Sequence, residues 1–306
     1  MVGERIESEA TAALEDPATE SFMAHRNLLF TVAYEILGSA ADAEDVLQET
    51  WLRWSGVELS TVLDERAYLV RIASRQALTR LRTLGRRRES YVGSWLPEPL
   101  LTTPDVAEDV ELADSVSTAM LLVLETLSPT ERAVFVLREV FDLPYDEIAQ
   151  AVGKSLAAVR QIAHRAKGHV AERRPRGITD PADARHALDA FQHAVETGDL
   201  QALIDILSPD VVLVGDGGGI KQAIPNPVRG ADRVARILDA GLRRTPQTVT
   251  VTPVQANGFP ALLIHFDQEL DAVLTLRIDN GLVSALYVVR NPEKLSRLTE
   301  PTPVTR

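Results

Sequence analysis

Cysteine is absent from the chain, which excludes a disulfide framework, a thiol nucleophile and every cysteine-ligated metal site. Histidine is scarce, with six scattered residues, so we expect neither a metal centre nor a bound cofactor. No apolar run reaches the roughly 18 residues that a membrane-spanning helix needs. The first twenty residues hold six acids and one arginine, the reverse of a secretory or transit peptide. These absences predict a cytoplasmic protein that does not associate with a membrane.

Basic residues are outnumbered overall, because the 306 residues carry a formal net charge of −12. Their distribution is nevertheless uneven. Seven arginines and no acid lie between Arg71 and Arg88, and seven Lys or Arg with one acid lie between Lys154 and Arg176. The stretch from Ser94 to Ser117 holds six acids and no basic residue. Two basic blocks separated by an acidic connector indicate local polyanion-binding faces that the total charge conceals.

The chain divides by composition into helical and mixed parts. Apolar residues recur at helical spacing from Phe22 to Leu84 and again from Val110 to Arg174. In the last third, helices at Arg185 to Asp199 and Leu200 to Leu207 precede strand-like runs, which indicates an α+β domain. The expected strands are Val211–Val214, Thr248–Gln255, Ala261–Phe266, Ala272–Ile278 and Leu282–Val289. The predicted segments are an acidic leader (1–20), a helical unit (21–90), a linker (91–113), a second helical unit (114–177), the α+β domain (182–298) and a tail (299–306).

A helix-turn-helix pattern lies between Leu143 and Arg165. Gly153 permits a tight turn after a short apolar-faced helix, and Ser155 can cap the helix that follows. The entrance and outer face of this second helix present groups suited to base edges and phosphates in a major groove. These candidates are Lys154, Ser155, Arg160, Gln161, His164 and Arg165. The alternative is an ordinary helical hairpin with a solvated basic face.

Two further segments carry charge on one side. The block from Arg71 to Arg88 favours a polyanion partner over a solvated helix surface, which usually carries acids as well. The helix expected from Asp42 to Trp54 leaves acids and Leu52 outside its apolar stripe. Such a face suits a basic protein partner, since charge steers the encounter and the leucine anchors it. Taken alone, however, this second pattern favours a solvated surface.

In this order, the pieces resemble a known family. Ala33-Tyr34-x-Ile36-Leu37-Gly38-Ser39, followed by Asp42-Ala43-Glu44-Asp45-Val46-x-Gln48-Glu49-Thr50-Trp51, resembles region 2 of extracytoplasmic-function (ECF) sigma factors. Leu127-Ser128-Pro129-x-Glu131-Arg132, which leads into the helix-turn-helix, resembles their region 4. The two motifs cover about residues 20–175 in the expected order. The implied fold is an all-α region 2 and an all-α helix-turn-helix region 4.

The resemblance assigns roles to the charged faces. A surface that binds core RNA polymerase would comprise Asp42, Glu44, Asp45, Gln48, Glu49 and Leu52. Promoter DNA at the −10 element would be melted and held by the loop from Ser55 to Asp64 together with Arg71, Arg75, Arg80, Arg82, Arg86 and Arg87. The helix-turn-helix candidates would read the −35 element as duplex. The acidic linker would occupy the positively charged RNA-exit path of the polymerase.

Three short segments resemble the signatures of one subgroup, whose members carry a C-terminal SnoaL-like domain of the nuclear-transport-factor-2 (NTF2) fold, an α+β cone. Residue 293 is glutamate where aspartate is usual, and the acid is retained. We expect these segments to have an interdomain, regulatory role in which the C-terminal domain docks on the sigma regions. They are Trp95, Leu96, Pro97, Glu98 and Pro99; Asp216, Gly217, Gly218, Gly219 and nearby Lys221; and Asn291, Pro292, Glu293, Lys294 and Leu295. The glycine run is expected to form a flexible, exposed loop with Asp216 and Lys221 as handles.

Two other interpretations of the C-terminal domain remain open. An enzyme would need acid–base groups, and only His265 and Asp267 share a predicted strand face; we expect no catalytic residue. A small-molecule sensor would use an apolar cavity lined by Leu203, Leu213, Phe259, Leu263, Leu274 and Leu276, although core packing predicts the same residues. For the whole chain, the alternative to a sigma factor is a stand-alone helix-turn-helix regulator with such a sensor domain.

Overall fold

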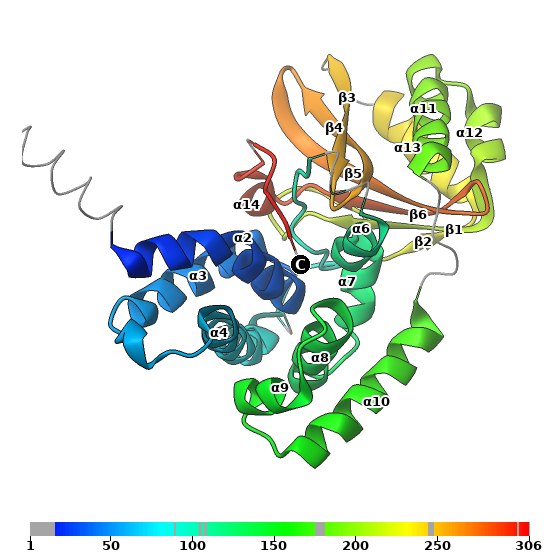
Figure 1. The fold of residues 1–306 in the computed structure, drawn as a ribbon. Coiled ribbons are helices and arrows are strands. Elements are labelled where there is room, and N and C mark those ends of the chain that lie inside the picture. Colours follow the sequence, from blue (N-terminus) through cyan, green and yellow to red (C-terminus); the bar gives the residue numbers. More distant parts are fainter. Residues whose placement is uncertain are drawn as a thin grey trace, which may run out of the picture. The chain divides into compact units, whose positions relative to one another are not determined.

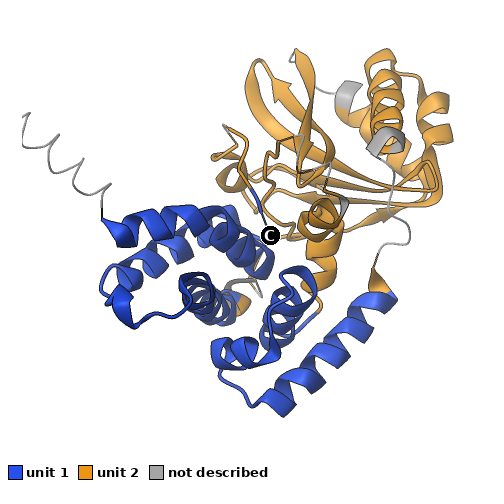
Figure 2. Ribbon diagram, in the orientation of Figure 1, with its two compact units in different colours: residues 1–84, 127–172, 304–306 blue, residues 85–126, 173–303 orange. Residues whose placement is uncertain are grey.

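The computed structural model describes residues 16–88, 90–103, 106, 109–174, 181–243, 248–298 and 300–305. It separates into two compact units, which Figure 2 colours differently. Unit 1 contains residues 1–84, 127–172 and 304–306, and unit 2 contains residues 85–126 and 173–303. The segment predicted to be a linker (91–113) therefore belongs to the same unit as the C-terminal domain.

Unit 1 is helical, as expected. Its first half comprises α2 (Pro17–Leu37), α3 (Ala40–Trp54), the short turn η1 (Leu59–Thr61) and most of α4 (Glu65–Arg88). Its second half comprises α8 (Pro129–Phe135), η2 (Val136–Val140), α9 (Tyr145–Val152) and most of α10 (Leu156–Arg173); Figure 1 labels the three α-helices.

The boundaries of the first helices follow from local capping. Gly38 ends α2 in the left-handed region (φ 68°), and Ser39 caps α3 by accepting a hydrogen bond from the next turn. Trp54 is fully buried, and its indole N–H donates to the Ala18 carbonyl at 2.8 Å. This contact helps to hold the start of α2, which begins at Pro17 and so extends into the predicted leader. Residues 1–15 of that leader lie outside the described part of the chain.

The second half of unit 1 begins with a complete capping box. The Ser128 hydroxyl accepts from the Glu131 backbone N–H, and the Glu131 carboxylate accepts from the Ser128 backbone N–H. Arg132 follows and is fully buried, and its guanidinium donates to the Glu35 carbonyl of α2 at 3.0 and 3.1 Å. Burial lowers the pKa of Arg132 to about 9, and the nearby Glu35 charge opposes that shift. Arg132 therefore ties the two halves of unit 1 together.

Unit 2 is an α+β domain whose described residues contain a six-stranded sheet of order β2-β1-β6-β5-β4-β3. Its strands are β1 (Leu207–Asp216), β2 (Val228–Arg229), β3 (Val249–Ala256), β4 (Phe259–Phe266), β5 (Glu269–Asp279) and β6 (Leu282–Val289). Strands β3 to β6 form the expected antiparallel meander, whereas β1 pairs with β6 in parallel. The helices in the C-terminal part of this unit are α11 (Pro181–Thr197), α12 (Leu200–Ile206), α13 (Ala231–Arg243) and α14 (Pro292–Leu295).

The two faces of the sheet are covered differently. One face packs against α11, α12 and α13 through an apolar core that includes Leu188, Phe191 and Leu203. The other face packs against Leu96 and residues of the segment 96–122, which includes α6 (Val110–Val116) and α7 (Thr118–Leu124). None of the helices in the described ranges combines the length and apolarity that crossing a membrane requires.

Candidate functional site

The helix-turn-helix has the geometry that its sequence predicts. Gly153 ends α9 with φ 67°, and the Ser155 hydroxyl caps α10 by accepting from Ala158 N–H at 3.3 Å. Val159 and Ala163 are buried on the inner face of α10. The candidate −35 residues are all exposed on the other side: Lys154, Ser155, Arg160, Gln161, His164 and Arg165. This face is therefore open to a nucleic acid within unit 1.

The predicted polymerase-binding residues on α3 divide into paired and exposed groups. Arg80 of α4 forms ion pairs with Asp42 at 2.6 Å and with Asp45, and Glu44 accepts both of its hydrogen bonds from Arg26 at 2.8 Å. By contrast, Gln48, Glu49 and Leu52 are exposed, Leu52 by 72%, and the exposed Glu49 also accepts a hydrogen bond from Gln76 of α4 at 2.9 Å. The freely accessible part of this face is therefore the second half of α3.

The arginines of α4 also have different surroundings. Arg75 and Arg82 are exposed, and Arg71 lies over the Tyr68 ring at 4.6 Å. Arg80 faces α3 instead, because its ion pairs with two carboxylates hold it there. The side chains of Arg86 and Arg87 lie outside the described residues.

A cleft lies beside Arg71 within unit 1. It has a volume of about 280 Å³ and is lined by the loop 61–64, by Ala67, Tyr68 and Arg71 of α4, and by Glu147 and Gln150 of α9. Leu63 is fully exposed at its rim. The cleft thus combines an aromatic ring, a guanidinium and an exposed apolar side chain, the groups that stack on bases and hold phosphates.

The subgroup signatures meet around Asp216 at the end of β1. Asp216 is fully buried, and its carboxylate accepts hydrogen bonds from the Tyr91 hydroxyl (2.6 Å), Leu96 N–H (2.9 Å), Gly218 N–H (3.0 Å) and the Lys294 ammonium (2.7 Å). Burial, then the bond to this carboxylate, raises the pKa of Tyr91. A buried carboxylate needs such hydrogen-bond partners. Because Tyr91 and Leu96 belong to the linker, their bonds to Asp216 hold the linker on the C-terminal domain.

Lys294 and Asn291 complete this cluster, which we call the linker-docking site. The Lys294 ammonium also donates to the Leu96 carbonyl and lies 4.4 Å from the centre of the Trp95 ring. Asn291 caps α14 and donates to the Tyr91 hydroxyl at 2.9 Å. The remaining signature residues surround these contacts: Pro97, Glu98, Pro99 and Leu295 are buried, Pro292 is half-buried and Glu293 is exposed.

The expectation of a flexible, exposed glycine loop was wrong for Asp216 and Gly217, which are buried, and for the half-buried Gly218, whereas Gly219 is exposed. A Cβ on Gly217 would lie 2.0 Å from the Lys221 carbonyl oxygen, and one on Gly218, whose φ is +64°, would lie 2.3 Å from the Asn291 amide nitrogen. Both positions therefore exclude a side chain because the turn is tightly packed. Lys221 is not a free handle either, since it pairs with Asp271 at 2.8 Å.

Sequence reasoning missed two anchors of the linker, Tyr91 and Asn257. Asn257 is 1% exposed, accepts from Leu100 N–H at 3.1 Å and donates to the Val116 carbonyl at 2.9 Å. Asn257-Gly258 is recognisable as a hairpin signal between the expected strands, but nothing in that dipeptide indicates a distant partner. Tyr91 could have been singled out as an aromatic residue in a polar linker.

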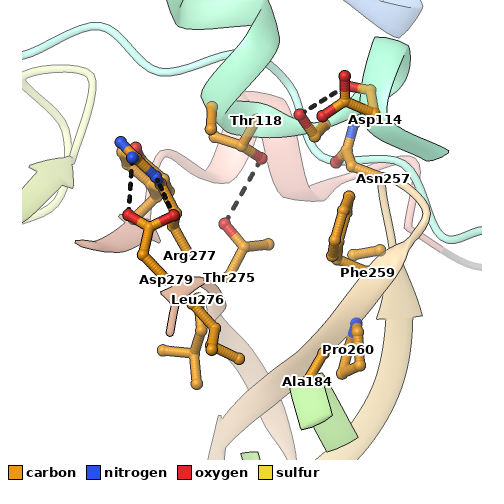
Figure 3. A pocket seen from close by; sticks show the side chains of 15 residues that line it. Asp114, Thr118, Ala184, Asn257, Phe259, Pro260, Thr275, Leu276, Arg277 and Asp279 are labelled. Carbon is orange, nitrogen blue, oxygen red and sulfur yellow. Dashed lines mark hydrogen bonds and ion pairs between the residues drawn. The ribbon is translucent and has the colours of Figure 1, made fainter. Parts of the chain in front are cut away.

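Figure 3 shows a second pocket, where α6 and α7 meet the sheet. Its polar side chains bond to one another: Arg277 pairs with Asp279 at 2.7 Å, and the Thr118 and Thr275 hydroxyls are 3.5 Å apart. Its volume is about 50 Å³. The proposed acid–base pair is not part of it, because Asp267 lies in the turn after β4, where its carboxylate accepts from Thr248 N–H.

A helix-turn-helix that follows a helical unit with acidic and basic faces is typical of a DNA-binding transcription factor. Residues 22–87 match the Sigma-70 region 2 family, and residues 117–170 match Sigma-70 region 4. The ECF RNA polymerase sigma factor SigJ of Mycobacterium tuberculosis is 35% identical over 90% of this chain and 92% of its own length. A probable ECF sigma factor of the same organism, SigI, is 34% identical over 92% of this chain and 96% of its own length.

The crystal structure of Mycobacterium tuberculosis SigJ superposes with a TM-score of 0.75 at 32% identity, covering 92% of this chain and 99% of that one. The chain therefore belongs to the ECF RNA polymerase sigma factors. This confirms the expected family and the expected fold of helical sigma regions followed by an α+β domain, and it decides against a stand-alone helix-turn-helix regulator.

Proposed function

We propose that this sigma factor binds core RNA polymerase and directs initiation at specific promoters, and that its SnoaL-like domain controls this activity through the linker. The observation that carries the proposal is the pair of sigma-region surfaces in unit 1: the exposed face of α10 and the cleft beside Arg71. A protein that reads two separate promoter elements needs two such surfaces.

At the −35 element, α10 would enter the major groove as a recognition helix. Arg160 and Arg165 are exposed and suit bidentate contacts to guanine, while Gln161 suits adenine. Lys154 and Ser155 at the helix entrance would bind phosphates, since helix N-termini and lysines position a protein on the DNA backbone.

At the −10 element, the cleft beside Arg71 would hold unpaired bases of the melted strand. Tyr68 would supply a surface on which a base stacks, and Leu63 would supply an apolar side chain at the edge of the cleft. Phosphates would be bound by Arg71, Arg75 and Arg82. Arg80 serves differently in this proposal: it holds α3 and α4 together through Asp42 and Asp45. Arg86 and Arg87 remain predictions from the sequence.

For the polymerase, we propose a surface centred on Gln48, Glu49 and Leu52, the exposed part of α3. The leucine would anchor the contact while the acids steer it toward a basic partner. Asp42, Glu44 and Asp45 would contribute mainly by shaping the helix pair, because each already bonds to an arginine.

The C-terminal domain would act by holding the linker. Leu96 and Leu100 are buried and their N–H groups bond to Asp216 and Asn257. A linker bound to the C-terminal domain in this way cannot also lie in the RNA-exit path of the polymerase. The C-terminal domain and the polymerase would therefore compete for the linker. Docking of the domain on the sigma regions themselves remains part of the proposal.

A small-molecule ligand has less support. Of the six residues expected to line a cavity, Leu203, Leu213 and Leu274 are buried in the packed core and Leu263 is partly buried, whereas Phe259 and Leu276 line the pocket in Figure 3. The pocket in Figure 3 measures about 50 Å³, whereas sites for organic ligands usually measure about 300–1,000 Å³. We therefore assign the C-terminal domain a protein-binding role rather than a catalytic or sensing one.

Initiation assays with purified core polymerase test the proposal. We expect the full-length protein to form a stoichiometric complex with the core and to produce discrete transcripts from a library of promoter fragments. Glu49→Lys, on the exposed acidic face, should weaken core binding, whereas Glu196→Lys serves as the charge-matched control, because Glu196 on α11 of unit 2 is also exposed and also accepts a hydrogen bond from a glutamine. The sigma-factor proposal would be contradicted if Glu49→Lys bound the core as tightly as wild type and the complex produced no transcripts.

A further inference from the structure

The turn that joins η2 to α9 has an unusual backbone. Val136–Val140 form a π-helical turn, and the Phe141 N–H donates to the Val136 carbonyl at 3.3 Å. Asp142 follows with φ +48°, in the left-handed region that residues other than glycine seldom occupy. Both features cost free energy and are common at functional sites. The side chains that this turn arranges are therefore candidates for a functional role.

The turn fixes the side chain of Arg138. Its guanidinium pairs with the Asp142 carboxylate at 2.9 Å and donates to the Leu143 carbonyl at 3.0 Å. It also lies 4.8 Å from the centre of the Tyr145 ring, which is half-buried at the start of α9. Because an aromatic face attracts a cation at this distance, the ring of Tyr145 is held by a cation that is itself tied to the backbone.

Arg160 of α10 lies beside the same ring. Its guanidinium carbon is 5.8 Å from the centre of the Tyr145 ring, within the roughly 6 Å over which the cation–π attraction acts. Arg160 is exposed, and in the described part of the chain no hydrogen bond or ion pair occupies its N–H groups. A ring face restrains a guanidinium without using these donors, whereas an ion pair uses them. The donors of Arg160 therefore remain available for a base.

A restrained guanidinium suits the reading of a guanine. Arginine recognises this base by donating two hydrogen bonds, to O6 and N7, and both must be aligned at once. A free arginine side chain loses rotamer freedom when it binds, and this loss weakens the contact. A ring that already limits the positions of Arg160 reduces the loss. Arg165, the other candidate for guanine, is exposed on α10 without a ring contact among the described residues.

We propose that Tyr145 is a positioning residue for −35 recognition: its ring, held by Arg138, orients Arg160 toward a guanine of the −35 element. This inference rests on the −35 role proposed for Arg160. It gives the strained turn between η2 and α9 a task, which is to present the ring to the recognition helix. Selectivity at one base pair would then depend on a side chain outside that helix.

Base discrimination by the reconstituted holoenzyme tests the inference. Duplexes that carry each single substitution in the −35 element of a selected promoter fragment compete for holoenzyme with wild-type or variant sigma factor. The base pair at which Arg160→Ala loses discrimination is the one that Arg160 reads. At this base pair we expect Tyr145→Leu to lose about 2- to 5-fold in discrimination, the factor that one exposed cation–π contact contributes. At the base pair identified in the same way by Arg165→Ala, Tyr145→Leu should discriminate like wild type.

Two further variants separate positioning from other roles of Tyr145. Tyr145→Phe keeps the ring and loses the hydroxyl, so it should discriminate like wild type. In the Arg160→Ala background, Tyr145→Leu should cause no further loss at the base pair that Arg160 reads, because the two residues act through one contact. A general loss of stability in Tyr145→Leu would instead weaken binding in both backgrounds and at all base pairs.

The outcomes distinguish this inference from the proposed function. If Arg160→Ala discriminates like wild type at every base pair, the −35 role of Arg160 fails and the positioning role fails with it. If Arg160→Ala loses discrimination and Tyr145→Leu keeps it, only the positioning role fails. Equal losses in Tyr145→Phe and Tyr145→Leu would also overturn it, since they would show that Tyr145 acts through its hydroxyl.

Discussion

Replacing Lys294 by methionine tests the linker-docking site most sharply. Lys294 is 12% exposed and pairs with the fully buried Asp216 at 2.7 Å. Removing the lysine leaves a buried carboxylate without its counter-charge, which costs about 3–5 kcal/mol. For a unit of this size, each kcal/mol lowers Tm by about 2–4 °C, so we expect unit 2 to unfold about 6–20 °C earlier.

Lys221→Met is the matched control. Lys221 also pairs with an aspartate, Asp271, at 2.8 Å, but it is 44% exposed and Asp271 keeps a second partner in Arg290. Asp271 is itself buried, but Arg290 still neutralises it when the half-exposed Lys221 is removed. The loss should therefore be about 0.2–1 kcal/mol, and this variant should unfold within about 4 °C of wild type. Scanning calorimetry of the full-length proteins gives both values. Because the chain also contains Trp51 and Trp54, the part of the fluorescence change that Trp95→Phe abolishes reports release of the linker. Equal losses in the two variants would refute the argument that burial makes the Lys294 pair critical.

Further predictions follow from other contacts. Gly218→Ala should destabilise unit 2 by about 1–3 kcal/mol in urea denaturation, because the left-handed φ strains alanine and its Cβ meets Asn291; an unchanged midpoint would contradict the packing. Arg132→Met should cost about 3–5 kcal/mol, since it removes the buried partner of Glu35; a loss below 1 kcal/mol would show that the tie is dispensable. Arg160→Ala should weaken −35 recognition by about 1–3 kcal/mol, and a DNase footprint with undiminished selectivity would argue against that role. The bond from Ser128 lowers the pKa of Glu131, so the folded state favours the ionised carboxylate. This contribution is present above pH ~4.5 and is lost as pH falls through the lowered value, and Glu131→Gln should lose that part of the acid dependence in urea titrations between pH 3 and 6.

The helical regions could be predicted because their signals are local. Capping at Ser39 and Ser128, the left-handed glycines 38 and 153, and apolar spacing determine the helix boundaries within a few residues. The exposed face of α10 followed from the same periodicity. One amphipathic helix, α13, was overlooked although Val234 and Ile237 are correctly spaced for it.

The docking of the linker could be predicted only in part. The aromatic ring and leucine of Trp95–Pro99 suit a docked segment, but the surrounding proline and acidic residues are typical of a solvated connector. Leu96 and Leu100 are buried and bond to Asp216 and Asn257, which lie more than a hundred positions away, so no local signal identifies these partners. Likewise, an aspartate followed by three glycines predicts an exposed turn at Asp216. Only the folded sheet brings Tyr91, Leu96 and Lys294 to the Asp216 carboxylate. The parallel pairing of β1 with β6 is non-local for the same reason.

The pairing of Arg80 with Asp42 and Asp45 shows the same limit in the sigma regions. Each residue belongs to a charged face that reads as a binding surface when its own helix is considered alone. Packing of α4 on α3 places opposite charges within bonding distance, so that these three residues are paired with one another, although Asp45 stays 45% exposed. Sequence reasoning therefore locates the surfaces, and the structure decides which of their members are available.

Initiation by core polymerase with and without the purified full-length chain tests the central claim most directly. The account predicts that discrete transcripts from promoter fragments appear only when the chain is present, and that Arg160→Ala lowers their yield while Gln192→Ala does not. Identical transcripts without the chain, or no transcripts together with no complex between the chain and the core, would contradict it.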